Sequence, residues 1–239
     1  MTRESSTNPL VLTSVGTKMV VAITGIALIL FVTAHMLGNL QIFAGADALN
    51  SYAVKLKSLG PLLWVARIGL LAVFVLHIVL TVKLSRANYA ARGAAASVSP
   101  VASLVGERYS HPYKYSTATA SSRFMILTGL LILLFVVYHL AHFTFHLFGE
   151  PPKLTAGKEL DVFNMVVQGF RNPWINVTYI SFQLVLGLHI YHGASSALQT
   201  LGLRIQISKN PINLCGIAIA GLITAGNISI PVAVWLHLL

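Results

Sequence analysis

The chain has 239 residues, of which 56% are hydrophobic and only 9% are charged, and its mean hydropathy is +0.77. Soluble domains are about 45–50% apolar, so this composition indicates a protein whose solvent is a lipid bilayer. The single cysteine, Cys215, excludes an internal disulfide, a thiolate-bound iron–sulfur cluster and a structural zinc site. The net charge of +10 does not indicate nucleic-acid binding, because the basic residues lie in connections between apolar runs.

Five runs with few or no charges follow one another along the chain. Each is longer than the roughly 20 residues that a helix needs to cross the hydrocarbon core. The sequence therefore predicts an all-α integral membrane protein that forms a single domain over residues 1–239. The expected spans cover about residues 19–44, 61–83, 123–148, 173–203 and 210–237, with the longer connections at 84–122 and 149–172.

The basic residues predict how these spans are oriented. The N-terminus and segments 83–123 and 204–209 carry most of the Lys and Arg, whereas on the other side basic and acidic residues nearly balance. The positive-inside rule then places the N-terminus in the cytoplasm and the C-terminus outside. The three tryptophans fall near expected outer ends, as an interfacial aromatic belt would: Trp64, Trp174 and Trp235.

The two longer connections differ in character. The cytoplasmic connection 84–122 is rich in Ala, Gly, Ser and Pro, so a linker and a docking surface both remain open. The outer connection 149–172 contains "LDVFNMVVQGF" (160–170), for which we expect a short helix lying in the membrane interface.

Seven of the nine histidines fall well inside expected spans; His111 lies in a connection and His237 at the C-terminal edge of the last span, and neither receives a role. A single histidine in a span is more often a polar residue satisfied by a neighbouring helix. One histidine near the middle of each of four spans favours a cofactor site in the core of a four-helix bundle. These four are His35, His77, His139 and His189.

The four histidines sort into two depths. His35 lies 12 residues before Asp47 and His139 lies 11 before Glu150, whereas His77 follows Lys57 by 20 and His189 follows Arg171 by 18. At about 1.5 Å per residue the layers lie about 17 Å and about 28 Å below the outer flank.

Two histidines in each layer predict two haems, each with two axial imidazoles. Zinc and di-iron sites need three or more ligands. His142 and His192 lie three residues from His139 and His189, and the depth count leaves them open as alternative ligands.

Several nearby residues are candidates for supporting roles. Arg67 could meet a propionate of the outer haem or extend to the outer interface, and Arg123 and Arg204 could serve the inner haem or anchor the membrane ends. His146, about one turn from Glu150, is an interfacial candidate near a quinone headgroup. Four glycines could admit a porphyrin face or a neighbouring helix: Gly25, Gly129, Gly187 and Gly193.

With these features the chain resembles the single-polypeptide, dihaem cytochrome b subunit of succinate:quinone oxidoreductases, including the related fumarate reductases. The similarity extends over essentially the whole chain and rests on four segments. In that family a Thr-Gly pair stands ten residues ahead of a ligand on two helices, and a His-x-x-x-Gly run begins with the fourth ligand. The matching segments are "SVGTKMVVAITGIALILFVTAHMLGN" (14–39), "VFVLHIVLTVKL" (73–84), "SSRFMILTGLLILLFVVYHLAHFTFH" (121–146) and "LGLHIYHGASSALQTLGL" (186–203).

The resemblance implies the ligand set. Thr24-Gly25 precedes His35, Thr128-Gly129 precedes His139, and His189 begins the run that ends at Gly193. By similarity, His139 is preferred to His142 and His189 to His192. The resemblance also implies that His35 and His139 bind the outer haem iron and that His77 and His189 bind the inner one. These are the pairs that the depth count suggested.

The resemblance further implies a multi-pass protein of the bacterial inner membrane that belongs to succinate dehydrogenase, and so to the respiratory chain and the tricarboxylic acid cycle. A flavoprotein that oxidises succinate and an iron–sulfur protein would dock on its cytoplasmic face. Electrons would pass through two haem b groups to a membrane quinone, menaquinone or ubiquinone. No segment of this chain is suited to bind flavin, so the dicarboxylate chemistry would lie on a partner.

The chain departs from the family at two places. Some dihaem fumarate reductases carry an intramembrane glutamate two residues before the fourth ligand, and Gly187 stands there. The acidic residue of their outer quinone site is matched most nearly by Asp47, with Asn50 at the equivalent spacing.

Two other functions compete with this one. A dihaem cytochrome b subunit of a formate dehydrogenase or hydrogenase is disfavoured by the Thr-Gly spacings and by one central ligand on each of four helices. A transporter with polar histidines would need broken helices at mid-membrane, and Pro is absent from the middle of every expected span.

Overall fold

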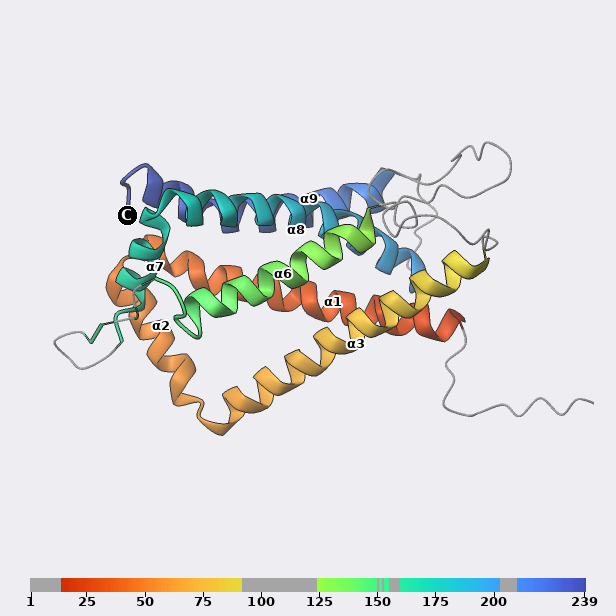
Figure 1. Cartoon of the computed structure of the whole chain (residues 1–239), viewed down its shortest axis with the longest axis horizontal. Coiled ribbons are helices and arrows are strands. Elements are labelled where there is room, and N and C mark those ends of the chain that lie inside the picture. The colour runs from red at the N-terminus through yellow and green to blue at the C-terminus, as the bar shows by residue number, and fades with distance from the viewer. Residues whose placement is uncertain (1–13, 92–123, 150, 152, 155–159, 203–209) are drawn as a thin grey trace, which may run out of the picture.

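The computed structural model describes residues 14–91, 124–149, 151, 153–154, 160–202 and 210–239. These residues form seven α-helices and one short 3-10 helix. Five long helices run along the length of the molecule, and two short ones gather with the C-terminus at one end, which we call the α2–α7 end (Figure 1). The elements are α1 (Ser14–Asn39), η1 (Leu40–Ala44), α2 (Ala46–Ser58), α3 (Pro61–Ala91), α6 (Met125–Phe143), α7 (Val162–Arg171), α8 (Pro173–Thr200) and α9 (Asn210–Trp235).

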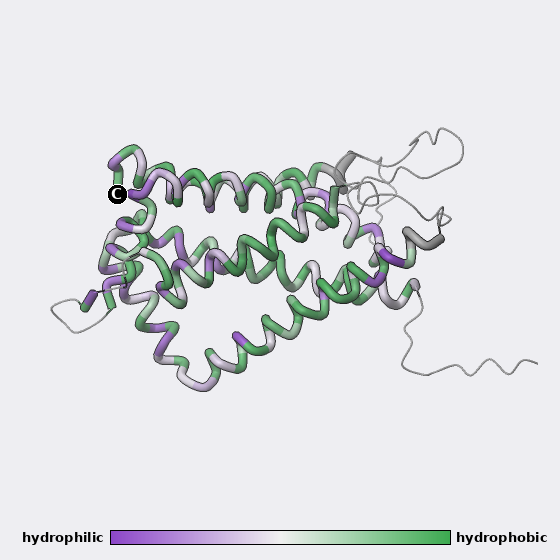
Figure 2. The backbone as a smooth tube through the Cα atoms, viewed as in Figure 1, coloured by the Kyte–Doolittle hydropathy of each residue, from purple (hydrophilic) through white to green (hydrophobic). Residues whose placement is uncertain are grey.

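Four helices are long and apolar enough to cross a membrane, so the all-helical membrane class predicted from the sequence is supported. The four segments are Ser14–Ala44, Pro61–Ala87, Met125–Phe143 and Leu214–Trp235. Figure 2 shows apolar residues along the middles of the long helices and polar residues gathered towards the two ends.

The fifth long helix, α8, is less apolar, although its 28 residues carry no charged side chain. It lies along α9 and also packs on α1 and α6. Polar side chains on it, such as Asn176 and Gln183, are 1% and 7% exposed. They face other helices instead of lipid, and α8 therefore has less need of an apolar surface.

Two expected helix ends differ from the structure. Helix α3 continues to Ala91, beyond residue 83, because residues 84–91 include good helix formers and no Gly or Pro. The remainder of the expected 84–122 connection lies outside the described residues. Helix α6 ends at Phe143 instead of near 148.

The early end of α6 changes the position of one histidine. Hydrogen bonds from Phe145 N to Leu140 O (2.8 Å) and from Leu147 N to Ala141 O (2.9 Å) close the helix. His146 follows in the left-handed conformation, with φ at 50°. His146 therefore lies outside the helix, although the expected span of residues 123–148 would include it.

The short helix expected within 160–170 is present as α7, and a further helix, α2, lies in the connection between η1 and α3. Asn50 of α2 joins the two: its Nδ2 donates to Asp161 Oδ1 (3.2 Å), and the Phe163 N–H donates to its Oδ1 (3.0 Å). Asp161 also caps α7 by accepting a hydrogen bond from Asn164 N (3.1 Å). Apolar residues of α7, including Phe170, are buried in the main core cluster at this end.

Helices α8 and α9 are in close contact along their length. Asn176 Nδ2 of α8 donates to Pro231 O (2.7 Å) and to Phe170 O (3.1 Å), which joins α7, α8 and α9. Gly187 faces Thr224 so closely that any side chain there would overlap the threonine hydroxyl. The sequence left open whether Gly187 admits a porphyrin face or a neighbouring helix, and in the structure the neighbouring helix α9 approaches it.

Candidate cofactor site

The first histidine pair lies close to the α2–α7 end. His35 stands four residues before the end of α1 and His139 four before the end of α6, about 6 Å along each axis. Their imidazole centroids are 5.9 Å apart and the ring planes are nearly perpendicular, at 89°. A metal–histidine bond is about 2.0–2.1 Å, so two imidazoles on opposite sides of one metal have centroids about 6 Å apart. The separation therefore suits a shared iron.

The second pair lies deeper in the bundle. His77 and His189 each follow the first residue of their helix, Pro61 of α3 and Pro173 of α8, by 16 residues, or about 24 Å. The two imidazoles are close enough to interact electrostatically. The structure thus places the four histidines at two levels, in the combinations that the depth count predicts.

The His77 ring is held by Thr24 of the neighbouring helix α1. The Thr24 hydroxyl lies 2.8 Å from Val20 O and 3.1 Å from Val21 O, and 3.0 Å from His77 Nδ1. A threonine hydroxyl has one hydrogen, and the carbonyls can only accept it. Oγ1 must therefore accept a hydrogen bond from Nδ1–H, which leaves the lone pair on Nε2 for a metal.

His189 is held in the same way by Thr128 of α6. The Thr128 hydroxyl lies 3.1 Å from both Phe124 O and Met125 O, and 3.0 Å from His189 Nδ1. By the same accounting of hydrogens, His189 donates from Nδ1 and keeps Nε2 free. Second-shell partners of this kind orient metal-ligating histidines and set their tautomer.

The glycine of each Thr-Gly pair faces the same imidazole as its threonine. A Cβ added to Gly25 would lie 3.3 Å from His77 Cε1, and one on Gly129 would lie 3.4 Å from His189 Cε1. Each Thr-Gly pair therefore holds the histidine of the next long helix, the threonine by a hydrogen bond and the glycine by close packing. The hairpin-like pairs α1–α3 and α6–α8 share this arrangement, which the sequence shows only as a repeated spacing.

His142 does not face the two histidine pairs as a free ligand. It is 3% exposed, its Nδ1 lies 3.0 Å from the Tyr179 hydroxyl, and its ring stacks on Phe148 with centroids 5.0 Å apart. Its Nε2 lies against two glycines, 3.0 Å from an added Cβ at Gly149 and 3.2 Å from one at Gly169. Both ring nitrogens are thus enclosed by protein. His192 is half-buried one turn beyond His189 on α8.

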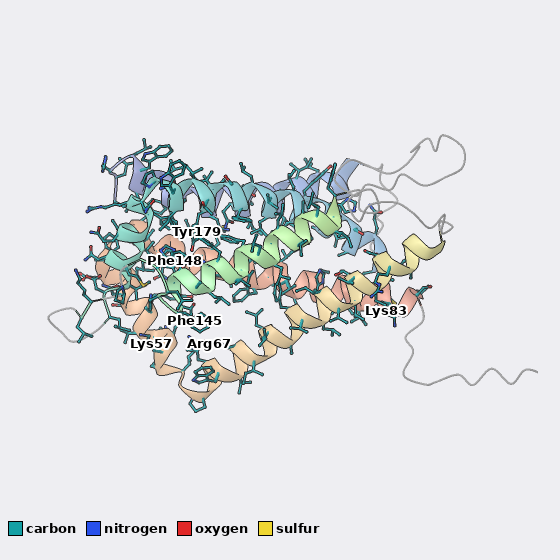
Figure 3. The ribbon with its side chains drawn as sticks, in the orientation of Figure 1. Lys57, Arg67, Lys83, Phe145, Phe148 and Tyr179 are labelled. Carbon is teal, nitrogen blue, oxygen red and sulfur yellow. The ribbon has the colours of Figure 1, made fainter. Side chains whose placement is uncertain are left out.

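Tyr179 is a site residue that the sequence reasoning missed. It is 5% exposed, and besides His142 its hydroxyl lies 3.4 Å from His139 Nδ1. Figure 3 shows Tyr179 and Phe148 towards the α2–α7 end of the bundle. The available signal was a tyrosine inside an apolar run, since a buried phenol requires a hydrogen-bond partner.

Of the three arginines suggested as propionate partners, the structure describes Arg67. Arg67 is exposed near the α2–α7 end of α3 (Figure 3), with its guanidinium Cζ 5.2 Å from the Trp64 ring centroid. A cation stacked on an aromatic ring is typical of a side chain extending to a membrane interface. Arg123 and Arg204 lie outside the described residues.

The two residues suggested for an outer quinone site lie on different segments of the α2–α7 end. Asp47 is exposed in the first turn of α2. His146 is half-buried after α6, and its Nδ1 is buried without a hydrogen-bond partner. Asn50, one turn beyond Asp47, is occupied by the contacts that attach α7.

Searches of known protein families, curated proteins and solved structures found no match to this chain. Within the described part of the chain, no three His, Cys, Asp or Glu side chains gather into a metal site. A haem iron differs in needing two axial protein ligands, because the porphyrin supplies the others. The histidine pairs fit that requirement by residue type, by number and, for His35 and His139, by separation.

Proposed function

We propose that the chain is the membrane-anchor cytochrome b subunit of a succinate:quinone oxidoreductase. Its four central histidines would hold two haem b groups, one between His35 and His139 and one between His77 and His189. The observation that carries the proposal is that four different helices supply these histidines as two pairs at two depths. In the deeper pair, both Nδ1 atoms are bonded to threonines and both Nε2 atoms are left for iron.

Haem with two axial imidazoles exchanges single electrons and has no open position for oxygen. The chain's own residues hold and orient the imidazoles. Thr24 and Thr128 hold the deeper pair, while Gly25 and Gly129 allow the rings to approach α1 and α6. The apolar surfaces of the long helices keep water away from both levels.

We further propose that α8 is the fifth membrane span. Its 28 residues measure about 42 Å, more than the roughly 30 Å hydrocarbon core. The α2–α7 end would then face outward and the start of α1 the cytoplasm of a bacterial cell. Lys83 and Arg86, exposed near the other end of α3, would lie on the cytoplasmic face where a flavoprotein and an iron–sulfur protein dock.

In this proposal the dicarboxylate chemistry belongs to the flavoprotein, and this chain passes electrons between the iron–sulfur protein and a quinone. Arg67 lies about 9 Å along α3 from Pro61 and is the described candidate for contact with a propionate of the outer haem. His146, with its buried Nδ1, and Asp47 are the candidates for contact with quinone at the α2–α7 end.

Purification of the tagged chain from membranes tests the functional assignment. We expect a flavoprotein and an iron–sulfur protein to co-purify, and the complex to reduce a quinone analogue with succinate as donor. A haem-containing preparation whose partners oxidise formate or hydrogen would instead assign the chain to another membrane oxidoreductase.

Alanine variants of the three histidines near the end of α6 test the ligand assignment. His139→Ala should lose one of two haems, whereas His142→Ala and His146→Ala should retain both, because these side chains are not axial ligands. The measurement is haem per polypeptide by the pyridine haemochrome method. Loss of a haem in the His142 variant with two retained in the His139 variant would reverse the assignment.

A further inference from the structure

The hydroxyl of Tyr179 lies between two histidines of α6. It is 3.0 Å from His142 Nδ1 and 3.4 Å from His139 Nδ1. The phenol is packed in the main core cluster and forms edge contacts with both imidazoles, with centroid distances of 5.7 Å to His142 and 5.9 Å to His139. Tyr179 therefore links a proposed iron ligand to a histidine that is not one.

The direction of these two hydrogen bonds follows if His139 binds iron through Nε2, so the inference rests on the proposed function. His139 Nδ1 must then carry the hydrogen and donate to Tyr179 Oη. The single phenolic hydrogen remains available to His142 Nδ1, which accepts it. Both hydrogen bonds are therefore donated in the same direction, from His139 to Tyr179 and from Tyr179 to His142.

The acceptor at the end of this chain is held in place by its surroundings. The His142 ring lies between Phe143 and Phe148, with centroids 4.0 Å and 5.0 Å away. Gly149 has φ at 88°, a conformation that side chains rarely adopt, and it and Gly169 leave room for Nε2. The ring therefore has little freedom to turn away from Tyr179, and Nδ1 stays directed at the phenol.

We propose that Tyr179 and His142 are positioning residues that lower the reduction potential of the haem bound at the His35–His139 pair. An acceptor on Nδ1–H gives the imidazole more anionic character, and a more basic ligand stabilises the oxidised iron. Donation of the phenolic hydrogen to His142 polarises the phenol and makes its oxygen a better acceptor. In the deeper pair, the acceptor at each Nδ1 is a threonine hydroxyl instead of a phenol. The reduction potentials of the two haems would therefore be set separately.

Redox titration of the purified protein, followed in the haem α-band, tests this proposal with variants that keep all four ligands. Tyr179→Phe removes only the hydroxyl, and we expect the midpoint potential of one haem to rise while the other is unchanged. His142→Leu, which keeps Tyr179 but removes its acceptor, should give a smaller rise in the same haem. His142→Asn, whose Oδ1 can accept near the position of Nδ1, should restore the potential towards that of the wild type.

Thr128→Val is the matched control, because it removes the corresponding acceptor from His189. It should raise the potential of the other haem and leave the Tyr179-dependent one unchanged. If both haems are bound and neither Tyr179→Phe nor His142→Leu moves a potential, the proposal is wrong. It is also wrong if these variants move the same haem as Thr128→Val. Absence of haem from the wild-type protein would instead refute the proposed function.

Discussion

Replacing Thr24 by valine should weaken the binding of one haem without disturbing the helix that carries the residue. Valine has nearly the shape of threonine, so the change removes the acceptor that lies 3.0 Å from His77 Nδ1 and little else. We therefore expect the loss of about 0.5–1.5 kcal/mol that is typical of a single hydrogen bond.

That free energy corresponds to a roughly 2–12-fold weaker affinity for the haem of the His77–His189 pair. The assay is titration of haem-depleted protein in detergent with haemin, followed by absorbance, to obtain the affinity of each site. Thr24→Ser keeps the hydroxyl and should bind as the wild type does. The affinity of the His35–His139 site should not change in either variant.

Thr33→Val is a suitable control on the same helix. Its hydroxyl also donates to a carbonyl one turn earlier, Ile29 O at 2.8 Å, but the structure records no histidine hydrogen-bonded to it. Equal affinities in the Thr24 and Thr33 variants would refute the reasoning that the threonine hydroxyl orients His77.

Two further predictions concern the scaffold. Gly216→Ala would place a Cβ 2.8 Å from Tyr191 O, so we expect α8 and α9 to separate slightly and the free energy of unfolding in detergent to fall by about 1–3 kcal/mol, measured by heat or denaturant. Gly221→Ala is the control, because no atom lies within 4 Å of its Cβ, and it should be neutral or slightly stabilising. Equal effects of the two variants would contradict the packing argument. Hydrogen bonding by the Asn164 side chain holds the pKa of Asp161 below its ordinary value, so its stabilisation of α7 is complete above about pH 4 and is lost as pH falls further. The protection of α7 amides against exchange, relative to the intrinsic rate at each pH, should accordingly not change through this group from pH 8 to 5 and should fall in acid. Asp161→Ala should lose about 1 kcal/mol of local stability at neutral pH; a variant with wild-type protection at pH 7 would contradict the capping role.

The positions of the long helices were predictable because lipid imposes a simple rule on sequence. Runs of about 20 apolar residues stand out in a chain that crosses a bilayer as helices, which satisfy their backbone hydrogen bonds internally. Helix α8 shows the limit of that rule. Its polar residues, among them Asn176, form hydrogen bonds to neighbouring helices. A hydropathy scale scores each residue by type alone, so it does not take such partners into account.

The two levels of histidines were predictable from counting alone, since helical rise converts sequence distance into depth. Their supporting contacts were not. That Thr24 would meet His77, 53 positions away in the sequence, depends on how α1 packs on α3. His146 was misplaced for a different reason: periodicity extends a helix until a breaker appears, and this chain turns at a residue that is not a usual breaker.

The central claim is that the four paired histidines hold two haems, and a difference spectrum tests it most directly. The purified chain, reduced with dithionite and compared with its oxidised form, should show the α-band of low-spin haem b at two haems per polypeptide. A preparation of folded protein from haem-sufficient cells that shows neither a Soret band nor an α-band would contradict the account.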